Sequence, residues 1–325
     1  MIKEEAIIIG AGPCGLAAAI ELERIGLHPV IIEKSNIAHS ISMYPTYMHF
    51  FSTPEKLEIG DIPFTTPNDK PSRLEAINYY RMAALRNNVR VNAYETVLRV
   101  ERQEDGQFHL TSTDRYGVEK HYEARYVVVA TGYFDHPNYL GIPGEQMDKV
   151  THFFREAHPY TGMEVAIIGG SNSAIDAALE LERVGAKVTV IYRGADYSRS
   201  IKPWVRPGFE GKVNNGIIRM LFNSRVVEID SHHVIVENPE GRHSVANDFV
   251  LALTGFHPDR DFLTSSGVKI EEEGFPYFDE TTMETNVPGL FLAGVVASKH
   301  EANEIFIESG RFHGTKIAQY IASLK

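Results

Sequence analysis

The chain of 325 residues contains a single cysteine, Cys14. One cysteine excludes an internal disulfide, a redox CxxC pair and a zinc cluster built on thiolates. So little cysteine is typical of proteins in a reducing compartment, and we therefore expect a cytoplasmic location. The histidines show no spacing typical of a metal site, so we expect no bound metal.

Long hydrophobic runs are also absent. No segment reaches the roughly 18 uninterrupted apolar residues that indicate a transmembrane helix. Glycines interrupt the apolar stretch that follows Lys3, and no cleavage site comes after it, so it is not typical of a signal peptide. The formal net charge of −11 argues against general binding to nucleic acids or anionic membranes. The sequence has no GxSxG element, which disfavours a hydrolase.

One pattern occurs twice in the chain. Residues 6–34 read AIIIGAGPCGLAAAIELERIGLHPVIIEK, and residues 165–193 read VAIIGGSNSAIDAALELERVGAKVTVIYR. Each copy has an apolar run, a turn of small residues, a helix-forming stretch and a second apolar run. This order predicts a strand–turn–helix–strand unit that binds a dinucleotide. Two such units in one chain indicate that electrons pass between two nucleotides.

The first turn matches GxGxxG through Gly10, Gly12 and Gly15. The first glycine permits a tight turn, the second lets a pyrophosphate approach the backbone, and the third lets helix and strand pack closely. Phosphates then bind at the amino end of the helix, which begins near Pro13. Glu33 ends the second strand, where an acid accepts hydrogen bonds from an unphosphorylated adenosine ribose. The first site therefore predicts FAD or NAD.

The second turn is a variant, whose residues are Gly169, Gly170, Ser171, Asn172, Ser173 and Ala174. Its serines can donate to phosphate oxygens. Tyr192 stands where the first copy has Glu33, and Arg193 follows it, with Arg199 nearby. Loss of the acid and gain of arginine predict a ribose 2′-phosphate, hence NADPH. A solvated basic loop remains the alternative, although residues 193–212 hold five basic and two acidic residues in an acidic protein.

We expect an α/β fold with two Rossmann-like (three-layer ββα) dinucleotide-binding domains, the second inserted in the first. An apolar strand within 287–294 and a helix over 305–322 would have no core to join if the first domain ended earlier. We therefore assign residues 1–134 and 256–325 to a discontinuous FAD-binding domain, and residues 135–255 to an NADPH-binding domain. The other expected elements are a helix at 74–87 and strands near 89–101, 107–113, 119–129, 225–230, 233–237 and 248–253.

Cys14 lies inside the first glycine turn, at the start of its helix. A helix amino terminus lowers the pKa of a thiol, so we expect a raised thiolate fraction. In one interpretation, Cys14 is a catalytic residue that attacks a disulfide substrate near the flavin. In the other, the position only needs a small residue.

The layout resembles the pyridine nucleotide-disulfide oxidoreductase superfamily, in particular its thioredoxin reductase-like branch. The matching motifs are GAGPCG, Ala130-Thr131-Gly132, GGSNSA, Leu253-Thr254-Gly255 and VPGLFLAG at 287–294. The resemblance implies that Lys34, Thr131, Gly132, Gly294 and Val295 also contact FAD. Val295 replaces the acid that usually binds the flavin ribityl chain, and the CxxC of thioredoxin reductases is missing.

A cysteine in the glycine turn without CxxC is similar to the bacillithiol disulfide reductase (YpdA-type) family. This resemblance implies that electrons pass from NADPH to FAD and then to bacillithiol disulfide, with Cys14 as the matching cysteine, in a homo-oligomer. Three alternatives stay open. These are a flavin-dependent monooxygenase, a ferredoxin- or flavodoxin-NADP reductase-like enzyme, and a non-catalytic redox sensor.

Overall fold

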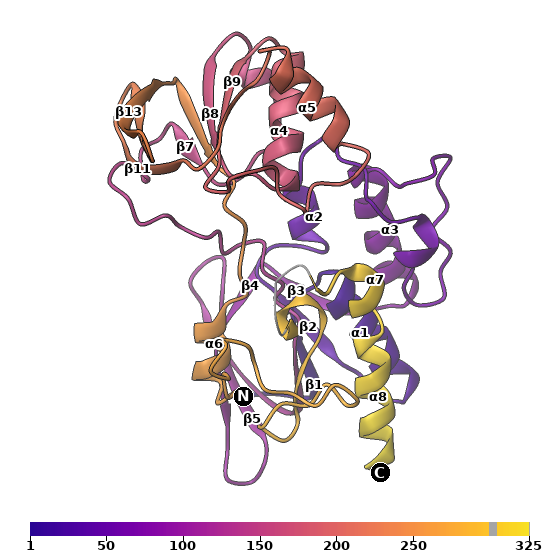
Figure 1. The fold of residues 1–325 in the computed structure, drawn as a ribbon. Coiled ribbons are helices and arrows are strands. Elements are labelled where there is room, and N and C mark those ends of the chain that lie inside the picture. Colours follow the sequence, from indigo (N-terminus) through magenta and orange to yellow (C-terminus); the bar gives the residue numbers. More distant parts are fainter. Residues whose placement is uncertain (299–303, 325) are drawn as a thin grey trace. The chain divides into compact units, whose positions relative to one another are not determined.

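The computed structural model describes residues 1–298 and 304–324 of the chain (Figure 1). These residues form two compact units. The boundaries predicted from the sequence lie after residues 134 and 255. Unit 1 consists of residues 1–136 and 256–325, and unit 2 consists of residues 137–255. Among the described helices, none combines the length and the apolar character that crossing a bilayer requires.

Unit 1 is built on a seven-stranded sheet in which one long strand belongs to two layers. The carboxyl half of β6 lies parallel to β1 on one side and to β15 on the other, whereas its amino half pairs antiparallel with β5. The tail strand β15 therefore completes the first sheet. The strands are β1 (Ile2–Ile9), β2 (Val30–Glu33), β3 (Arg90–Ala93), β4 (Glu95–Arg102), β5 (Phe108–Asp114), β6 (Glu119–Val129) and β15 (Leu290–Leu292).

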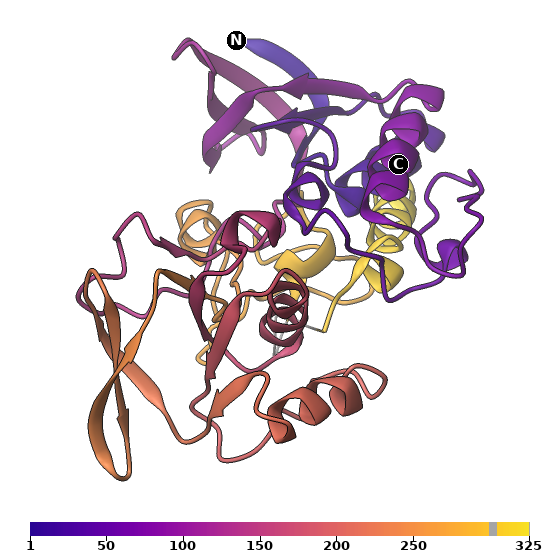
Figure 2. The same cartoon turned by 90° about the horizontal axis from the view of Figure 1, so that it is seen from above.

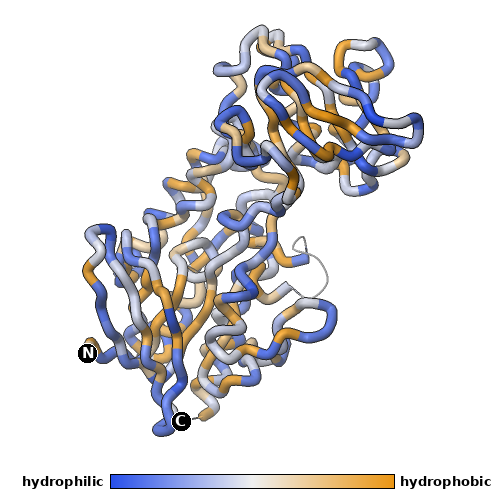
Figure 3. Tube along the Cα trace, turned by 90° about the vertical axis from the view of Figure 1, so that its left-hand side faces the viewer, coloured by the Kyte–Doolittle hydropathy of each residue, from blue (hydrophilic) through white to orange (hydrophobic). Residues whose placement is uncertain are grey.

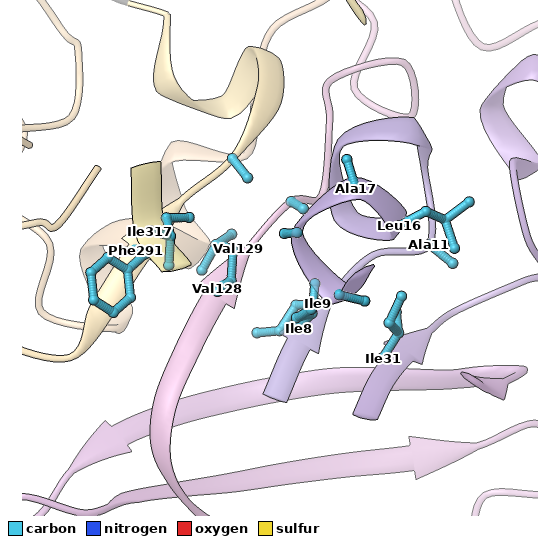
Figure 4. Packing of buried hydrophobic residues seen from close by; sticks show 14 of the residues in the cluster. Ile8, Ile9, Ala11, Leu16, Ala17, Ile31, Val128, Val129, Phe291 and Ile317 are labelled. Carbon is cyan, nitrogen blue, oxygen red and sulfur yellow. The ribbon is translucent and has the colours of Figure 1, made fainter. Parts of the chain in front are cut away.

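Helices cover the parallel part of this sheet, and α1 and α8 lie side by side (Figure 1). Gly314 allows this approach, because a Cβ at its position would lie 2.5 Å from the Cα of Ala18. The hydrophobic core fills the space between these helices and the strands (Figure 4). The helices are α1 (Pro13–Arg24), α2 (His39–Met43), α3 (Arg73–Arg86), α6 (Arg260–Ser265), α7 (Ile307–Gly310) and α8 (His313–Ser323), with 3₁₀ turns η1 (Pro54–Lys56) and η3 (Gly294–Ala297).

Local sequence explains where several of these helices begin and end. Ser72 and Glu75 form a capping box at the start of α3, in which the Glu75 carboxylate accepts from the Ser72 N–H at 2.7 Å. Gly26 follows α1 with a φ of 78°, a left-handed conformation that is common for glycine at the carboxyl end of a helix.

Two elements of unit 1 differ from the prediction. The expected strand at 89–101 is two strands, because Tyr94 adopts a φ of 59° between β3 and β4. The expected helix at 305–322 is also two helices, separated by Arg311 and Phe312. The side chain of Arg311 donates to the carbonyl oxygens of Glu55 and Glu58. These hydrogen bonds lie at the interruption between α7 and α8. Hydrophobic periodicity alone cannot reveal either interruption.

A buried carboxylate joins the strands of the antiparallel layer. Glu95 is 1% exposed and accepts from Ser112 Oγ at 2.6 Å, Tyr122 OH at 2.7 Å and Lys120 Nζ at 2.7 Å. Burial opposes ionisation of this carboxyl, but the three donors outweigh it and lower the pKa of Glu95. The ionised form therefore stabilises the folded unit.

We expect Glu95→Gln to lower the free energy of unfolding at pH 7 by about 1–3 kcal/mol. Since the folded-state pKa is lowered, the contribution of Glu95 is present above its unfolded pKa of about 4.3 and is lost as pH falls through the folded pKa. The difference in the free energy of unfolding between variant and parent should thus become smaller below about pH 4. Urea unfolding over a pH series measures this difference. Glu101→Gln is the control, because this carboxylate is exposed in the same strand. Equal losses in the two variants would contradict the prediction.

Unit 2 repeats the layered plan on a smaller scale. A five-stranded parallel sheet in the order β10-β9-β8-β14-β7 lies between the antiparallel strands β11–β13 and the helices α4 and α5 (Figure 1). From above, the antiparallel strands extend to one side of that sheet (Figure 2). The elements are β7 (Val150–Thr151), η2 (His158–Tyr160), β8 (Glu164–Ile168), α4 (Asn172–Arg183), β9 (Lys187–Ile191), α5 (Arg206–Asn214), β10 (Arg219–Leu221), β11 (Arg225–Ile229), β12 (His233–Asn238), β13 (Gly241–Ala246) and β14 (Phe249–Ala252).

Valine and isoleucine side chains from both sheets form a hydrophobic cluster in unit 2. Hydrophobic residues follow the inner strands of each unit, and hydrophilic residues follow the turns (Figure 3). The interpretation of residues 193–212 as a loop is wrong in its second half, because α5 begins at Arg206, immediately before Pro207. Proline is well tolerated in a first helical turn, and this signal was available in the sequence.

Candidate functional site

The glycine turn of unit 1 joins β1 to α1 and is tightly packed. Gly10 has a φ of 107°, and a Cβ at this position would lie 2.6 Å from the carbonyl oxygen of Ala130. A Cβ on Gly15 would lie 2.0 Å from the carbonyl oxygen of Gly10. Both positions therefore need glycine, one for conformation and contact and the other for contact alone.

The same turn offers room and polarity for a phosphate. A Cβ added to Gly12 would meet nothing within 4 Å, so the backbone there faces open space. Gly12 is the N-cap of α1, no side chain caps this end, and Pro13 occupies the first helical turn. The amino end of a helix carries partial positive charge and unpaired amides. These residues fit the pyrophosphate of a dinucleotide.

Glu33 is buried beside this turn. Its carboxylate accepts from the Ala11 N–H at 2.7 Å and from the Ser35 N–H at 2.8 Å. The side chain thereby fixes the glycine turn against the end of β2, and its remaining lone pairs are suited to ribose hydroxyls. Lys34, the next residue, forms an ion pair with Asp135 at 2.7 Å.

The other predicted FAD contacts meet the turn at one edge of the sheet. Because β1, β6 and β15 are parallel neighbours, their carboxyl ends lie together. Thr131 and Gly132 follow β6, and Gly294 and Val295 follow β15. The structure thus brings these four residues to the edge where Gly10 begins its turn, the position at which ligands bind in open α/β sheets.

Cys14 packs against two of the tail glycines. A Cβ added to Gly294 would lie 3.0 Å from Cys14 Sγ, and one added to Gly310 would lie 2.8 Å from it. Although the residue keeps some accessible surface, burial raises the pKa of its thiol to about 12. The prediction of a lowered pKa is therefore wrong. The helix amino terminus contributes only about 0.3–1 kcal/mol, and loss of solvent outweighs it here.

His313 is a buried residue of this region that sequence reasoning missed. Its Nδ1 accepts a hydrogen bond from the Gly294 N–H at 3.1 Å. Burial, with a smaller effect of Lys316, lowers the pKa of His313 to about 4, so the ring is neutral at pH 7. A signal was available, because His313 precedes Ile317 and Ile321 on the buried face of the last helix, at spacings of four.

The second glycine turn, in unit 2, has the same construction. A Cβ on Gly169 would lie 2.4 Å from the carbonyl oxygen of Leu253. In the first turn, a Cβ on Gly10 would meet the carbonyl oxygen of Ala130 in the same way. Gly170 lies against the ring of Tyr192, which a Cβ would approach to 2.4 Å. The duplication therefore extends to the strand ends that hold the turns.

The start of α4 follows this turn. Ser171 is its N-cap without a side-chain cap hydrogen bond, and Asn172, Ser173 and Ala174 form the first helical turn. A phosphate fits this end of the helix for the same reasons as in unit 1.

Four of the five basic residues in 193–212 divide into two groups. Arg206 pairs with Glu210 and Lys212 with Glu182, so their charges are already compensated within unit 2. Arg193 and Arg199 are exposed and form no ion pair within the described part of the chain. In residues 1–298 and 304–324, no group of three metal-ligating side chains could hold a metal ion.

Comparison with known proteins gives matches along the whole chain. A family model described as pyridine nucleotide-disulphide oxidoreductase matches residues 7–294. The bacilliredoxin reductase Bdr of Bacillus subtilis (strain 168) is 52% identical over 324 residues, which cover 99% of this chain and 98% of that protein.

Two solved structures are similar throughout their length. Bacillithiol disulfide reductase Bdr (YpdA) from Bacillus cereus has a TM-score of 0.97 and 53% identity, covering 99% of this chain and 100% of that one. Its counterpart from Staphylococcus aureus has a TM-score of 0.95 and 48% identity, with both chains fully covered. These likenesses confirm the predicted fold of two dinucleotide-binding domains. The chain belongs to the pyridine nucleotide-disulphide oxidoreductase family.

Proposed function

We propose that this chain is a bacillithiol disulfide reductase. FAD and NADPH are the cofactors of its family, in agreement with a first turn that predicts FAD or NAD and a second that predicts NADPH. The observation that carries the choice of substrate is Cys14, packed within the FAD-type turn of a chain that aligns throughout with proteins named for bacillithiol disulfide. The proposed reaction converts NADPH, a proton and one disulfide into NADP⁺ and two thiols.

Each unit takes one cofactor in this proposal. Unit 1 binds FAD through the open backbone at Gly12, the dipole of α1 and the carboxylate of Glu33. Unit 2 binds NADPH at the start of α4, with Arg193 and Arg199 at the ribose phosphate. FAD, when bound, accepts a hydride from NADPH and supplies two electrons to the disulfide.

Cys14 is the proposed nucleophile. Its thiolate attacks one sulfur of the disulfide, which forms a mixed disulfide on Cys14 and expels the other half as a thiolate. That thiolate takes up a proton equivalent to the one lost by Cys14 and leaves as the first thiol. Two electrons and a proton then release the second thiol. Since burial raises the pKa of Cys14, its proton must leave before the attack, and the free thiol is protonated at neutral pH.

The relative from Bacillus subtilis is named for bacilliredoxin, which makes an oxidised bacilliredoxin a second candidate substrate. Anaerobic NADPH oxidation by the purified protein, with each disulfide in turn, distinguishes the two. Two free thiols released per NADPH with bacillithiol disulfide alone would support the proposal. Turnover only with oxidised bacilliredoxin would move the assignment to the second substrate. Flavin that NADPH reduces but neither disulfide reoxidises would refute both and favour oxygen or a protein electron carrier.

Two further proposals concern the setting of the protein. We place it in the cytoplasm, because one cysteine and a need for NADPH match a reducing compartment. We also propose a homo-oligomer with no nucleic-acid partner, the latter from the net charge of −11. Light scattering after gel filtration tests the oligomer, and a monomer at micromolar concentration would contradict it.

The choice of NADPH over NADH should depend on Arg193 and Arg199. We expect the double variant Arg193→Ala/Arg199→Ala to lower the NADPH-over-NADH ratio of kcat/KM by roughly 10- to 100-fold, since charge-assisted contacts to a phosphate are lost. Steady-state kinetics with both nucleotides measures this ratio. Arg206→Ala is the matched control, because Glu210 already pairs with that guanidinium. An unchanged ratio in the double variant would show that the loop does not read the phosphate.

A further inference from the structure

The side chain of Asn172 is used to hold a loop. Its Nδ2 donates to the carbonyl oxygen of Ser200 at 2.8 Å, and its Oδ1 accepts from the Lys202 N–H at 2.9 Å. Asn172 is the first residue of α4, and Ser200 and Lys202 belong to the segment 198–202 that follows β9. One amide side chain thus attaches this segment to the phosphate-binding end of α4 through two hydrogen bonds of ordinary length.

The attached segment brings hydroxyl groups to the same place. Ser200 Oγ donates to Ser171 Oγ at 3.2 Å, and Ser198 Oγ lies 2.8 Å from Ser200 Oγ. Ser171 is the N-cap of α4, yet its hydroxyl makes no cap hydrogen bond. Having accepted from Ser200, this hydroxyl keeps its own hydrogen to donate to an anion.

Arg199 lies between the two serines of this segment. Its side chain is exposed and forms no ion pair with the described residues. Asn172 holds the backbone just after Arg199, at Ser200 and Lys202. This attachment restricts where the guanidinium can reach, and it lowers the entropy lost when that group binds a phosphate. Ile201, in contrast, is 4% exposed, so its burial restrains the segment independently of Asn172.

We propose that Asn172 is a positioning residue for the ribose 2′-phosphate of NADPH, which acts by holding segment 198–202 and Arg199 rather than by touching the nucleotide. This inference rests on the proposed NADPH site. Asn172 thus has a different role from the other residues of the second glycine turn. In the proposed site, their backbone amides and serine hydroxyls contact the pyrophosphate directly. In this proposal, the preference of segment 198–202 for NADPH over NADH also depends on Asn172, which lies outside that segment.

The test measures nucleotide fragments by calorimetry on the FAD-loaded protein, without turnover. We expect Asn172→Ala to weaken binding of 2′,5′-ADP roughly tenfold, equal to about 1.4 kcal/mol, because two hydrogen bonds that order the segment are lost. Binding of 5′-AMP, which lacks the 2′-phosphate, should change by less than about threefold, since the contact between Arg199 and the 2′-phosphate is not made. Asn215→Ala, at an exposed position after α5, is the control for an asparagine removed elsewhere.

A second pair of variants shows how Asn172 acts. If it acts through Arg199, Asn172→Ala should add little once Arg199→Ala is present, so the two effects are not additive. Additive effects, equal losses for both nucleotides, or no loss would each overturn the inference. Failure of the parent protein to prefer 2′,5′-ADP would instead refute the proposed NADPH site, and the inference with it. Circular dichroism and flavin content verify that each variant is folded, as the buried Ile201 leads us to expect.

Discussion

Replacing Cys14 by alanine is expected to lower disulfide-dependent NADPH oxidation by roughly two to four orders of magnitude, because the nucleophile is removed. FAD should stay bound and NADPH should still bleach it. The cavity left by the sulfur is small, and alanine keeps the Cβ that packs near Gly294. Stopped-flow absorbance separates the two steps, since flavin reduction and its reoxidation by the disulfide are followed at one wavelength.

Cys14→Ser provides the matched control for this experiment. Serine restores the size and polarity of the side chain but is a poor nucleophile towards sulfur, so it should be as inactive as alanine. If either variant kept parental turnover with bacillithiol disulfide, Cys14 would be only a small residue required by the turn. That result would favour direct reduction of the acceptor, as in a ferredoxin-NADP reductase-like enzyme.

The parts of the site that depend on backbone geometry were predictable from the sequence. Gly10 needs a positive φ, and Gly15 lies against a carbonyl oxygen, so the chain can form this turn only with glycine at both positions. The helices α1 and α4 follow from the same repeated pattern, and α1 begins at Pro13, as expected. Motifs of this kind are readable because one residue type satisfies one local constraint.

The features that depend on tertiary packing were not predictable. The pKa of Cys14 is raised by burial, and the residues packed against its sulfur include Gly294 of η3 and Gly310 of α7, which lie far along the chain. The role of Asn172 depends on where the segment after β9 comes to lie. Neither contact leaves a periodic signal, whereas His313 did so through its spacing from Ile317.

Replacing Gly15 by alanine is the second change for which we expect a large effect. The added methyl group would lie 2.0 Å from the carbonyl oxygen of Gly10 and 3.2 Å from its carbon, so the backbone of the turn must move. Gly10 cannot move freely, since its own space is limited by the Ala130 carbonyl oxygen. We expect loss of FAD by at least about a hundredfold in affinity and destabilisation of the FAD-free protein by about 1–3 kcal/mol. Flavin fluorescence and thermal unfolding measure the two losses.

Gly12→Ala tests the loss of FAD binding without the clash against the protein's own backbone that accompanies it at Gly15. Its Cβ would meet nothing within 4 Å, and its φ of −73° suits any residue, so the FAD-free protein should unfold as the parent does. The same methyl group would occupy the space through which a pyrophosphate approaches the backbone, so FAD affinity should still fall by about a hundredfold. Loss of stability without loss of FAD in Gly12→Ala would contradict this assignment of the turn. The predicted pattern is instead lost binding at both glycines and lost stability only at Gly15, because only Gly15 lies against the protein's own backbone.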